Sequence, residues 1–311
     1  MKLRTIFLII FFKSIYAGVN AQGCSDAGVC TINSFKNYPG NTAKDSLHSA
    51  SLLTGIFYGI GEQKTNVYTY FAEFNSGIGK RISCSVKMTM TSIQGELAKN
   101  AGLSDLFLSS SYRLNLSGTS RSSIVLGMKI PLNHANAKNF GNPLPMVYQL
   151  SLGTYDLIAG YSLIYKGIGL SLGYQQPLIN ANHNGFIPAP HSFPNELGLN
   201  YLPTNGYQRK ADILARLTYN LRLEKYKLAF RPGLLPIYHL GNDSYADASG
   251  QRISLDGSKG LTLNGTASID FNLNKNNTFE LTAARPFIAR KTIPDGLLRH
   301  FLVGLMYRGK L

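Results

Sequence analysis

"LTLNGTASIDFNL", residues 261–273, decides the fold class because apolar and polar side chains alternate along almost its whole length. One parity holds Leu263, Ala267, Ile269 and Phe271, and the other holds Thr262, Asn264, Thr266, Ser268, Asp270 and Asn272. Successive side chains of a strand point to opposite faces, so the stretch predicts a strand with one apolar and one polar face. Such a strand fits a soluble sandwich, in which the apolar face packs on a second sheet. It also fits an outer-membrane barrel, in which that face meets lipid.

The N-terminus predicts the compartment. Basic residues precede the apolar run "TIFLIIFF", and Val19 and Ala21 occupy the small-residue positions of a cleavage site. This pattern predicts a secretory signal peptide over residues 1–21. A membrane anchor is disfavoured because Lys13 interrupts the run well short of the about 20 apolar residues that a span needs. A lipoprotein signal ending at Cys24 is the minor alternative, because "AQG" departs from the residues that usually precede such a cysteine.

The remainder divides into an N-terminal periplasmic segment, residues 22–50, and one barrel domain, residues 51–311. Mean hydropathy is −0.04 although 44% of the residues are hydrophobic. This combination is typical of a barrel, because the hydropathies of alternating polar and apolar residues cancel when they are averaged along the chain. We expect twelve strands: "SLLTGIFYGIG", "VYTYFAEF", "ISCSVKMTMTS", "DLFLSSSYRLN", "SIVLGMKI", "YDLIAGYSLIY", "IGLSLGYQQ", "ADILARLTYN", "KLAFRPGLL", the 261–273 stretch, "FELTAAR" and "FLVGLMYRG".

The connections favour the barrel over the sandwich. The even-numbered ones are short: "NSGIGKR", "LSGTSR", "KG", "LRLEKY" and "NKNN". The odd-numbered ones are mostly long, including 131–154, 177–210, 238–260 and 286–300. Bacterial barrels have short periplasmic turns and long outer loops. The sequence therefore predicts an all-β, transmembrane, antiparallel up-and-down β-barrel of about twelve strands in the cell outer membrane, with both termini periplasmic.

Several segments also resemble a known family. "GLSDLFLSSSYRL", "GMKIPL" and "LSLGTYDLIAGYSLIY" are similar to parts of the outer-membrane barrels described as transporters of the phenol meta-degradation pathway, distant relatives of long-chain fatty-acid transport barrels. The likeness covers about residues 102–176. It implies an outer-membrane barrel with a transport role, and its motifs carry no catalytic signature.

Strand parity predicts which charged side chains line the lumen. A basic side chain at the lipid midplane costs about 2–4 kcal/mol, so strand charges should face inward. The predicted lumen-lining residues are Glu73, Lys87, Arg113, Lys129, Asp156, Asp212, Arg216, Lys227, Arg231, Asp270, Glu280 and Arg308. Because the set mixes signs with a basic excess, it fits either a salt-bridged network that fills the barrel or a polar conduit that favours anions.

The formal charge of +15 would fall to about +12 when Lys2, Arg4 and Lys13 leave with the signal peptide. Basic residues near strand ends predict contacts with lipopolysaccharide phosphates outside and with anionic lipid headgroups inside. A nucleic-acid partner is disfavoured by the envelope address and the lack of a concentrated basic run. A small solute is the other expected partner, and a surface or periplasmic protein partner stays open.

No catalytic, metal or cofactor motif stands out. None of the six histidines has a motif around it, and no pair of them has the helical spacing of a zinc site. The stretches "GTS" and "SGTSR" lack the context of a nucleophile elbow. The protein is therefore expected not to be an enzyme, and His239 or His300 beside a serine is the only catalytic geometry that the pattern offers. We expect no cofactor.

The two function classes are a channel or transporter for small or hydrophobic solutes and a non-transporting scaffold of a surface or secretion complex. The loop 177–210 carries prolines together with Phe186, Phe193, Tyr201 and Tyr207. A long loop of this composition is functional rather than disordered. It predicts an ordered lid, a contact surface or a loop that folds inward to constrict the pore.

"GCSDAGVC" places Cys24 and Cys30 just after the predicted cleavage site. An oxidising periplasm and a turn-forming spacer favour a Cys24–Cys30 disulfide. Acylated Cys24, a metal-binding pair and free thiols are the alternatives. The bond would stiffen residues 22–50, which would enter the barrel as a plug or latch or remain an inert tail.

Overall fold

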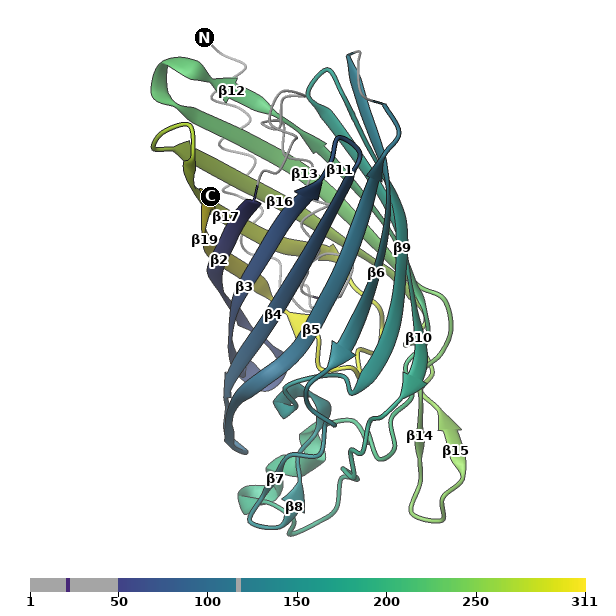
Figure 1. Ribbon diagram of the computed structural model, residues 1–311. Helices are drawn as coiled ribbons and strands as arrows, with labels where there is room; N and C mark the ends of the chain where they lie inside the picture. The colour runs from purple at the N-terminus through teal and green to yellow at the C-terminus, as the bar shows by residue number, and fades with distance from the viewer. Residues whose placement is uncertain (1–20, 23–49, 116–118) are drawn as a thin grey trace.

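Twelve antiparallel strands close into a barrel in the computed structural model, which describes residues 21–22, 50–115 and 119–311 (Figure 1). Each strand pairs with its sequence neighbour, and β19 pairs with β2 to close the ring. The strands are β2 (Ala50–Ile60), β3 (Asn66–Ile78), β4 (Ile82–Gln94), β5 (Lys99–Arg113), β6 (Ser120–Pro131), β9 (Thr154–Tyr165), β10 (Ile168–Asn180), β11 (Asp212–Tyr219), β13 (Leu228–His239), β16 (Gly260–Asn272), β17 (Asn277–Ile288) and β19 (Phe301–Lys310).

Every strand expected from the sequence is present, so the predicted fold class and strand number are confirmed. Several strands are longer than their patterns indicate, and the largest extension at one end is that of β5, which begins at Lys99 rather than Asp105. A bulge in β5 explains the difference: Met88 pairs with Leu106, but Met90 pairs with Leu103. The extra residue reverses the parity of β5 and turns the adjacent Ser104 and Asp105 both inward, where they are buried.

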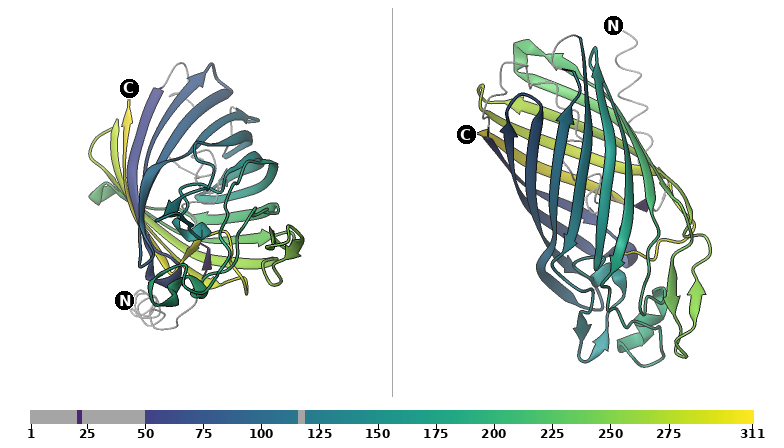
Figure 2. Two further views of the ribbon diagram at one scale, coloured as in Figure 1. Left: turned by 90° about the horizontal axis from the view of Figure 1, so that it is seen from below. Right: turned by 45° about the vertical axis from the view of Figure 1, so that its right-hand side comes forward.

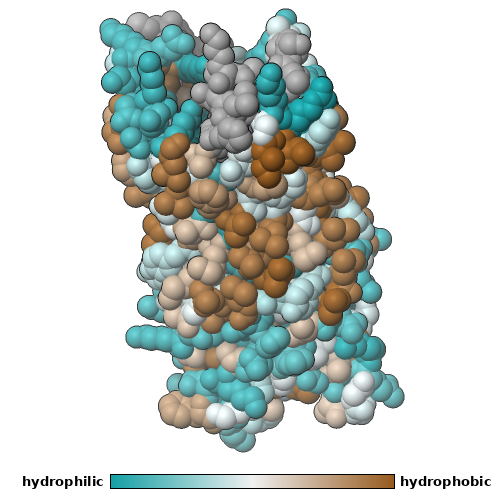
Figure 3. Space-filling view, viewed as in Figure 1, coloured by the Kyte–Doolittle hydropathy of each residue, from teal (hydrophilic) through white to brown (hydrophobic). Residues whose placement is uncertain are grey.

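Alternation along the strands produces an apolar belt. In β16, the odd-numbered Ile269 and Phe271 are 43% and 45% exposed, whereas the even-numbered Thr262 and Asn264 are at most 1% exposed. A closed barrel leaves only its interior to bury that second face. On the outer surface, Figure 3 shows a hydrophobic band between two hydrophilic ends.

Two prolines interrupt hydrogen bonding without ending their strand. β13 pairs continuously with β16 through Pro232 and Pro236, without a bulge. On its other side, the β11–β13 ladder skips the residues around Pro236, and pairing resumes on β12 (Leu221–Leu223) after a second gap opposite Pro232. Both gaps keep the register. Because proline has no N–H to donate, it interrupts the hydrogen bonds of the ladder but does not shift the register.

The two ends of the barrel differ in their connections. At the short-turn end, the strands are joined by residues 79–81, 114–119, 166–167, 220–227 and 273–276. At the opposite, long-loop end, four segments form what we call the cap: residues 132–153, 181–211, 240–259 and 289–300. Figure 2 shows the cap segments crossing the barrel mouth. The alternation of connection length is as the sequence predicts.

Short elements complete the fold. They are β1 (Ala21–Gln22), η3 (Glu62–Lys64), β7 (Lys138–Asn139), β8 (Asn142–Pro143), η4 (Met146–Tyr148), η5 (Pro194–Asn200), η6 (Glu224–Tyr226), β14 (Ser244–Ala246), β15 (Arg252–Ser254) and β18 (Leu298–Arg299). β1 pairs with β18. Within the described ranges, no helix is long and apolar enough to span a membrane, a finding that does not bear on a β-barrel.

Three predictions lie largely outside the described residues. They are the signal peptide, the segment 22–50 as a plug or latch, and the Cys24–Cys30 disulfide. Cys84, which the structure does describe, is a free cysteine in β4 with its sulfur 3.7 Å from the Ser110 hydroxyl.

Candidate functional site

Most of the predicted lumen residues are buried on the inner face of the barrel. Eight are no more than 7% exposed: Glu73, Lys87, Lys129, Asp156, Asp212, Arg231, Asp270 and Glu280. Arg113, Arg216 and Arg308 are half-buried. Lys227 differs, because it lies exposed in the turn before β13 with a left-handed backbone (φ 54°). Parity holds only inside a strand, so placing Lys227 in the lumen wall was wrong.

Opposite charges are matched across neighbouring strands. Lys129 Nζ lies 3.1 Å from Asp156 Oδ2 and donates to Thr154 Oγ1 at 2.9 Å. Gln175 also donates to Asp156, at 2.5 Å. Glu73 lies directly opposite Lys87 in the β3–β4 ladder. These contacts fit the salt-bridged interpretation of the lumen, because a buried charge is tolerated only when it is paired.

A second group links β13, β16, β17 and β19. Arg231 reaches both Asp270 oxygens, at 2.5 and 2.7 Å, and lies 3.3 Å from Glu280 Oε2. Arg308 lies 3.8 Å from the same Glu280 oxygen. Two guanidinium groups therefore face two carboxylates, and the formal charge of this group is zero.

The interior is not uniformly polar. Phe107, Val125, Ile158, Leu214, Leu235 and Ile237 form an apolar cluster, which we call the mid-barrel cluster. Its members come from β5, β6, β9, β11 and β13, and each is at most 3% exposed. These strands make up one continuous side of the barrel together with β10, and their inward side chains pack into one cluster. The mid-barrel cluster therefore occupies part of the lumen with apolar side chains, whereas the list of charged residues predicts a wholly polar lumen.

The cap is an ordered, largely apolar layer. Tyr148, Phe186, Phe193 and Tyr201 pack with the long-loop ends of β3 and β4. A second cluster joins Tyr207 to residues of the other cap segments. All four aromatic residues singled out in the 177–210 loop are at most 6% exposed. The 177–210 loop therefore packs against the barrel mouth through its aromatic residues, which is the arrangement shared by the lid and constriction interpretations.

Asparagine amides hold the cap segments together. Asn184 Nδ2 donates to Ala135 O at 3.1 Å and to Leu144 O at 2.9 Å. Asn182 Nδ2 donates to Leu152 O at 2.9 Å. These side chains satisfy backbone carbonyls that an irregular loop would otherwise bury without partners.

Six ionisable residues form a buried network beneath the cap, which we call the cap lock: Arg209, Asp212, His239, Asp243, Arg290 and Asp295. Arg209 pairs with Asp212 and lies 3.5 Å from Asp295. Arg290 lies 2.9 Å from Asp295. Burial raises the pKa of Asp295, but the two nearby guanidinium groups outweigh burial and lower this pKa to about 2. The lock ties three cap segments to β11 and β13.

His239 lies at the centre of the cap lock. Its Nδ1 is 2.7 Å from Asp212 Oδ1, and its Nε2 is 2.7 Å from Asp243 Oδ1. Ionised carboxylates only accept hydrogen bonds, so both bonds form when both ring nitrogens carry protons. The protonated ring makes the lock electrically neutral, with three cations and three anions. Because carboxylates occupy both nitrogens, His239 offers no free base to a serine.

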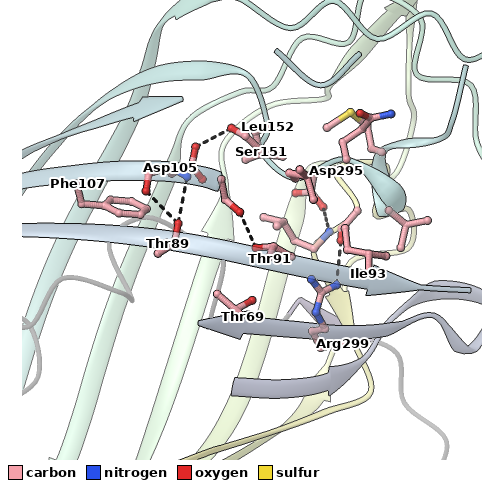
Figure 4. A pocket seen from close by; sticks show the side chains of 17 residues that line it. Thr69, Thr89, Thr91, Ile93, Asp105, Phe107, Ser151, Leu152, Asp295 and Arg299 are labelled. Atoms are coloured by element: carbon pink, nitrogen blue, oxygen red, sulfur yellow. Dashed lines mark hydrogen bonds between the residues drawn. The ribbon is translucent and has the colours of Figure 1, made fainter. Parts of the chain in front are cut away.

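A small cavity of about 40 Å³ lies between the cap and the strand wall (Figure 4). Thr69, Thr89 and Thr91 line it from the strands, and Asp295 and Arg299 line it from the cap. The cavity has room for ordered water. Within the described residues, no cluster of His, Cys, Asp or Glu fits a metal ion.

One bond joins the wall to the cap beside this cavity. Ser151 Oγ donates to Asp105 Oδ1 at 2.6 Å. Thr89 Oγ1 donates to Asp105 O at 3.0 Å and accepts from Asp105 N at 3.1 Å. Thr89 thus stabilises the β5 bulge, and the bulge aims Asp105 at the cap.

Sequence reasoning missed the cap residues of the lock, Arg209, Asp243, Arg290 and Asp295. His239 was noted for a catalytic geometry that the structure does not contain. A usable signal was present in "HLGND", where Asp243 follows His239 by four residues at the end of a strand. The other partners are up to 86 residues apart, and no local pattern connects them.

Comparison with known proteins identifies the fold. No family model matches the chain, and no curated protein matches it. Among solved structures, an outer membrane channel from Pseudomonas putida F1 has a TM-score of 0.58 at 11% identity, covering 88% of this chain and 99% of the channel. The NanC porin has a TM-score of 0.45 at 9% identity, covering 84% and 100%. The CymD monoaromatic hydrocarbon channel has a TM-score of 0.44 at 10% identity, covering 94% and 98%. The chain has the fold of outer-membrane channels.

Proposed function

We propose that the protein is a channel of the bacterial outer membrane and that the cap closes its outer mouth in the conformation described. The observation that carries the proposal is the two-faced wall of a closed barrel. Apolar side chains are exposed on the outside, and charged or hydroxyl side chains are buried inside. A soluble β-sandwich would not expose a continuous apolar belt to water, whereas a transmembrane barrel places such a belt against lipid.

The membrane orientation follows from the two ends. The cap would face outward, and the short-turn end and both termini would lie in the periplasm. Export would use the signal peptide expected over residues 1–21. Lipopolysaccharide and anionic lipids are the proposed membrane partners.

A lumen wall of charges and hydroxyl groups supports small hydrophilic solutes as the cargo. The resemblance of residues 102–176 to transporters of the phenol pathway instead supports small hydrophobic solutes, which would meet the mid-barrel cluster. The polar wall is the larger feature, so we give hydrophilic solutes precedence.

A second function is favoured by a specific observation. The mid-barrel cluster lies inside the lumen and the apolar cap lies over one mouth, an arrangement expected of a scaffold that transports nothing and presents its outer loops to a partner. Single-channel recording in a planar bilayer separates the two functions. Stepwise current through the purified, folded protein supports the channel. Silence of the wild type alone fits either the scaffold or a closed transporter. Silence of both the wild type and the cap-lock variant Asp243→Ala, each with its heat-modifiable barrel intact, supports the scaffold.

The orientation has its own test. Phe140 lies at the tip between β7 and β8 and is 98% exposed. Chymotrypsin added to intact cells should cut the chain there and should spare Tyr226 in the turn 220–227, which is 60% exposed at the other end. Cleavage at Tyr226 with Phe140 intact would reverse the orientation.

A further inference from the structure

A large cleft lies in the cap, between the β7–β8 hairpin and the loop that contains η5, and we call it the hairpin cleft. Its volume is about 790 Å³, within the range of sites that bind small organic ligands. Figure 1 shows β7 and β8 at the end of the molecule beyond the barrel strands. Three stretches of chain line the cleft: the β4–β5 connection with Glu96, the hairpin with Asn139, Phe140 and Asn142, and residues 191–196.

Hydrogen bonds hold the three sides of the hairpin cleft together. Asn139 Nδ2 donates to Leu97 O at 2.7 Å and joins the hairpin to the β4–β5 connection. Asn142 Nδ2 donates to Ser192 O and joins the hairpin to the η5 loop. Phe193, which also lines the cleft, is 6% exposed and packs in the apolar layer of the cap. The cleft is therefore a formed part of the cap rather than a gap between unconnected loops.

Phe140 suits neither its turn nor its exposure. Asn139 pairs with Asn142, so Phe140 and Gly141 form the two-residue turn of the hairpin, with φ angles of 47° and 85°. Such a turn favours asparagine, aspartate or glycine at its first position, because a bulky side chain is strained at positive φ. The side chain is also 98% exposed, so it contributes almost no packing within the cap. Neither the turn nor the core requires a phenylalanine, whereas a ligand in the cleft would cover its ring.

The η5 side of the cleft carries the same kind of backbone strain. His191, Asn195 and Glu196 have φ angles of 64°, 54° and 55°. Together with Phe140, they are four of the nine non-glycine residues with positive φ in the described part of the chain. Such residues cluster where a chain clamps a ligand. The strain of the cap is thus concentrated around the hairpin cleft.

The lining of the cleft is largely polar, but its described residues include no lysine or arginine. This composition disfavours phosphate and carboxylate ligands, which arginine binds well. Asparagine, serine and histidine side chains both donate and accept hydrogen bonds, and the carboxylates of Glu96 and Glu196 accept them. Sugar hydroxyl groups also do both, and the C–H face of a sugar ring packs on an aromatic ring. An acyl chain, by contrast, would leave the polar groups without partners.

We propose that the hairpin cleft binds an uncharged oligosaccharide, with one sugar ring stacked on Phe140 and with hydroxyl groups bonded to Glu96, Glu196 and the neighbouring amides. Under the proposed orientation, the cleft faces the outside of the cell, where it would capture glycans. Binding at the cleft requires no conduction, so this proposal and the channel function fail separately.

A glycan array tests the binding of the purified full-length mature protein to neutral, anionic and amino-bearing oligosaccharides. The detergent is a polyoxyethylene ether, because glycoside detergents carry sugars of their own. Wild-type protein should bind a group of neutral oligosaccharides. Absence of binding to every neutral glycan would overturn the site. Binding confined to amino-bearing glycans would assign the cleft to cations and would overturn it as well.

Variants of Phe140 locate the binding. Isothermal titration with the neutral oligosaccharide that binds most strongly on the array should show about tenfold weaker affinity for Phe140→Asn, because the ring is lost. Asparagine suits the turn better than phenylalanine, so the hairpin should stay folded. Phe140→Tyr keeps the ring and should bind as the wild type does. The matched control is Tyr226→Ala, which removes an aromatic ring that is 60% exposed at the short-turn end and should leave the affinity unchanged.

Binding inside the lumen would give a different pattern. Equal affinity of Phe140→Asn and the wild type would place the sugar in the lumen or on another surface and would overturn the cleft. Equal losses in Phe140→Asn and Tyr226→Ala would do the same. Glu196→Gln should weaken binding by about fivefold, because a neutral amide accepts a weaker hydrogen bond than a carboxylate does.

Discussion

The two ends of the barrel treat charge in opposite ways. At the long-loop end, the cap lock brings three acidic groups against two arginines and His239, and the salt bridges among them join opposite charges. At the short-turn end, Arg121, Lys166 and Arg222 line one cavity, and Arg113 and Arg222 both repel Arg121. Balanced buried charge holds segments in place, whereas a surplus of one sign attracts mobile ions. Under the proposed channel function, this difference places closure of the lumen at the long-loop end.

Removing one carboxylate from the cap lock should have the largest effect. Asp243 accepts hydrogen bonds from His239, from the Tyr207 hydroxyl at 2.7 Å and from Lys210 N at 2.9 Å. Asp243→Ala leaves buried partners uncompensated, at a cost of about 3–5 kcal/mol. We expect chymotrypsin to digest the cap of the purified variant much faster than that of the wild type.

Asp247→Ala is the control for this variant, because Asp247 is exposed in the same cap segment, residues 240–259. The cap of Asp247→Ala should be digested by chymotrypsin no faster than the wild-type cap. An Asp243→Ala protein as resistant as this control would show that the lock does not hold the cap.

Two adjacent residues of β16 test the inner and outer faces of the wall. Asp270→Leu removes both short contacts between Asp270 and Arg231, although Arg231 keeps its contacts with Glu280 and Ser268, so the variant should lose about 2 kcal/mol of unfolding free energy. Ile269→Val trims a lipid-facing side chain and should change stability by less than about 0.5 kcal/mol. Urea-dependent folding into lipid vesicles measures both. Equal tolerance at the two positions would refute the assigned faces.

A smaller effect depends on pH. Burial, followed by the nearby charge of Asp295, raises the pKa of Glu62 from 4.5 to about 7. The native carboxyl holds its proton more tightly than the unfolded one, so the free energy of unfolding should fall as pH rises from about 4.5 to about 7. Partial exposure limits the change to about 1–2 kcal/mol.

Glu62→Gln should flatten the stability profile across that window. Asp295 acts in a separate window, because its pKa is lowered from 3.8 to about 2 and its contribution is lost only as pH falls through that range. Urea titrations of both proteins at a series of pH values check the result. If the free energy of unfolding of Glu62→Gln falls with pH as steeply as that of the wild type, a group other than Glu62 is responsible.

The sequence predicts the wall far better than the cap. Alternation is a local signal, and the 261–273 stretch alone fixes which side of β16 is buried. It fails where a strand stops or bulges: Lys227 already belongs to a turn, and the bulge at Ser104 hides the true start of β5. Arg285 shares the outward parity of Leu281 in β17, so the inward rule for strand charges also has an exception. The cap lock was not predictable, because Arg209 meets Asp295 only after two loops fold together.

Ion selectivity of a cap-opened channel tests the central account most directly. The measurement is the reversal potential of Asp243→Ala in a planar bilayer under a tenfold potassium chloride gradient. A sealed cap and a basic mouth predict larger currents than the wild type carries, with a reversal potential of the sign that marks chloride as the favoured ion. A folded variant that stays silent, or one that prefers potassium, would contradict the account.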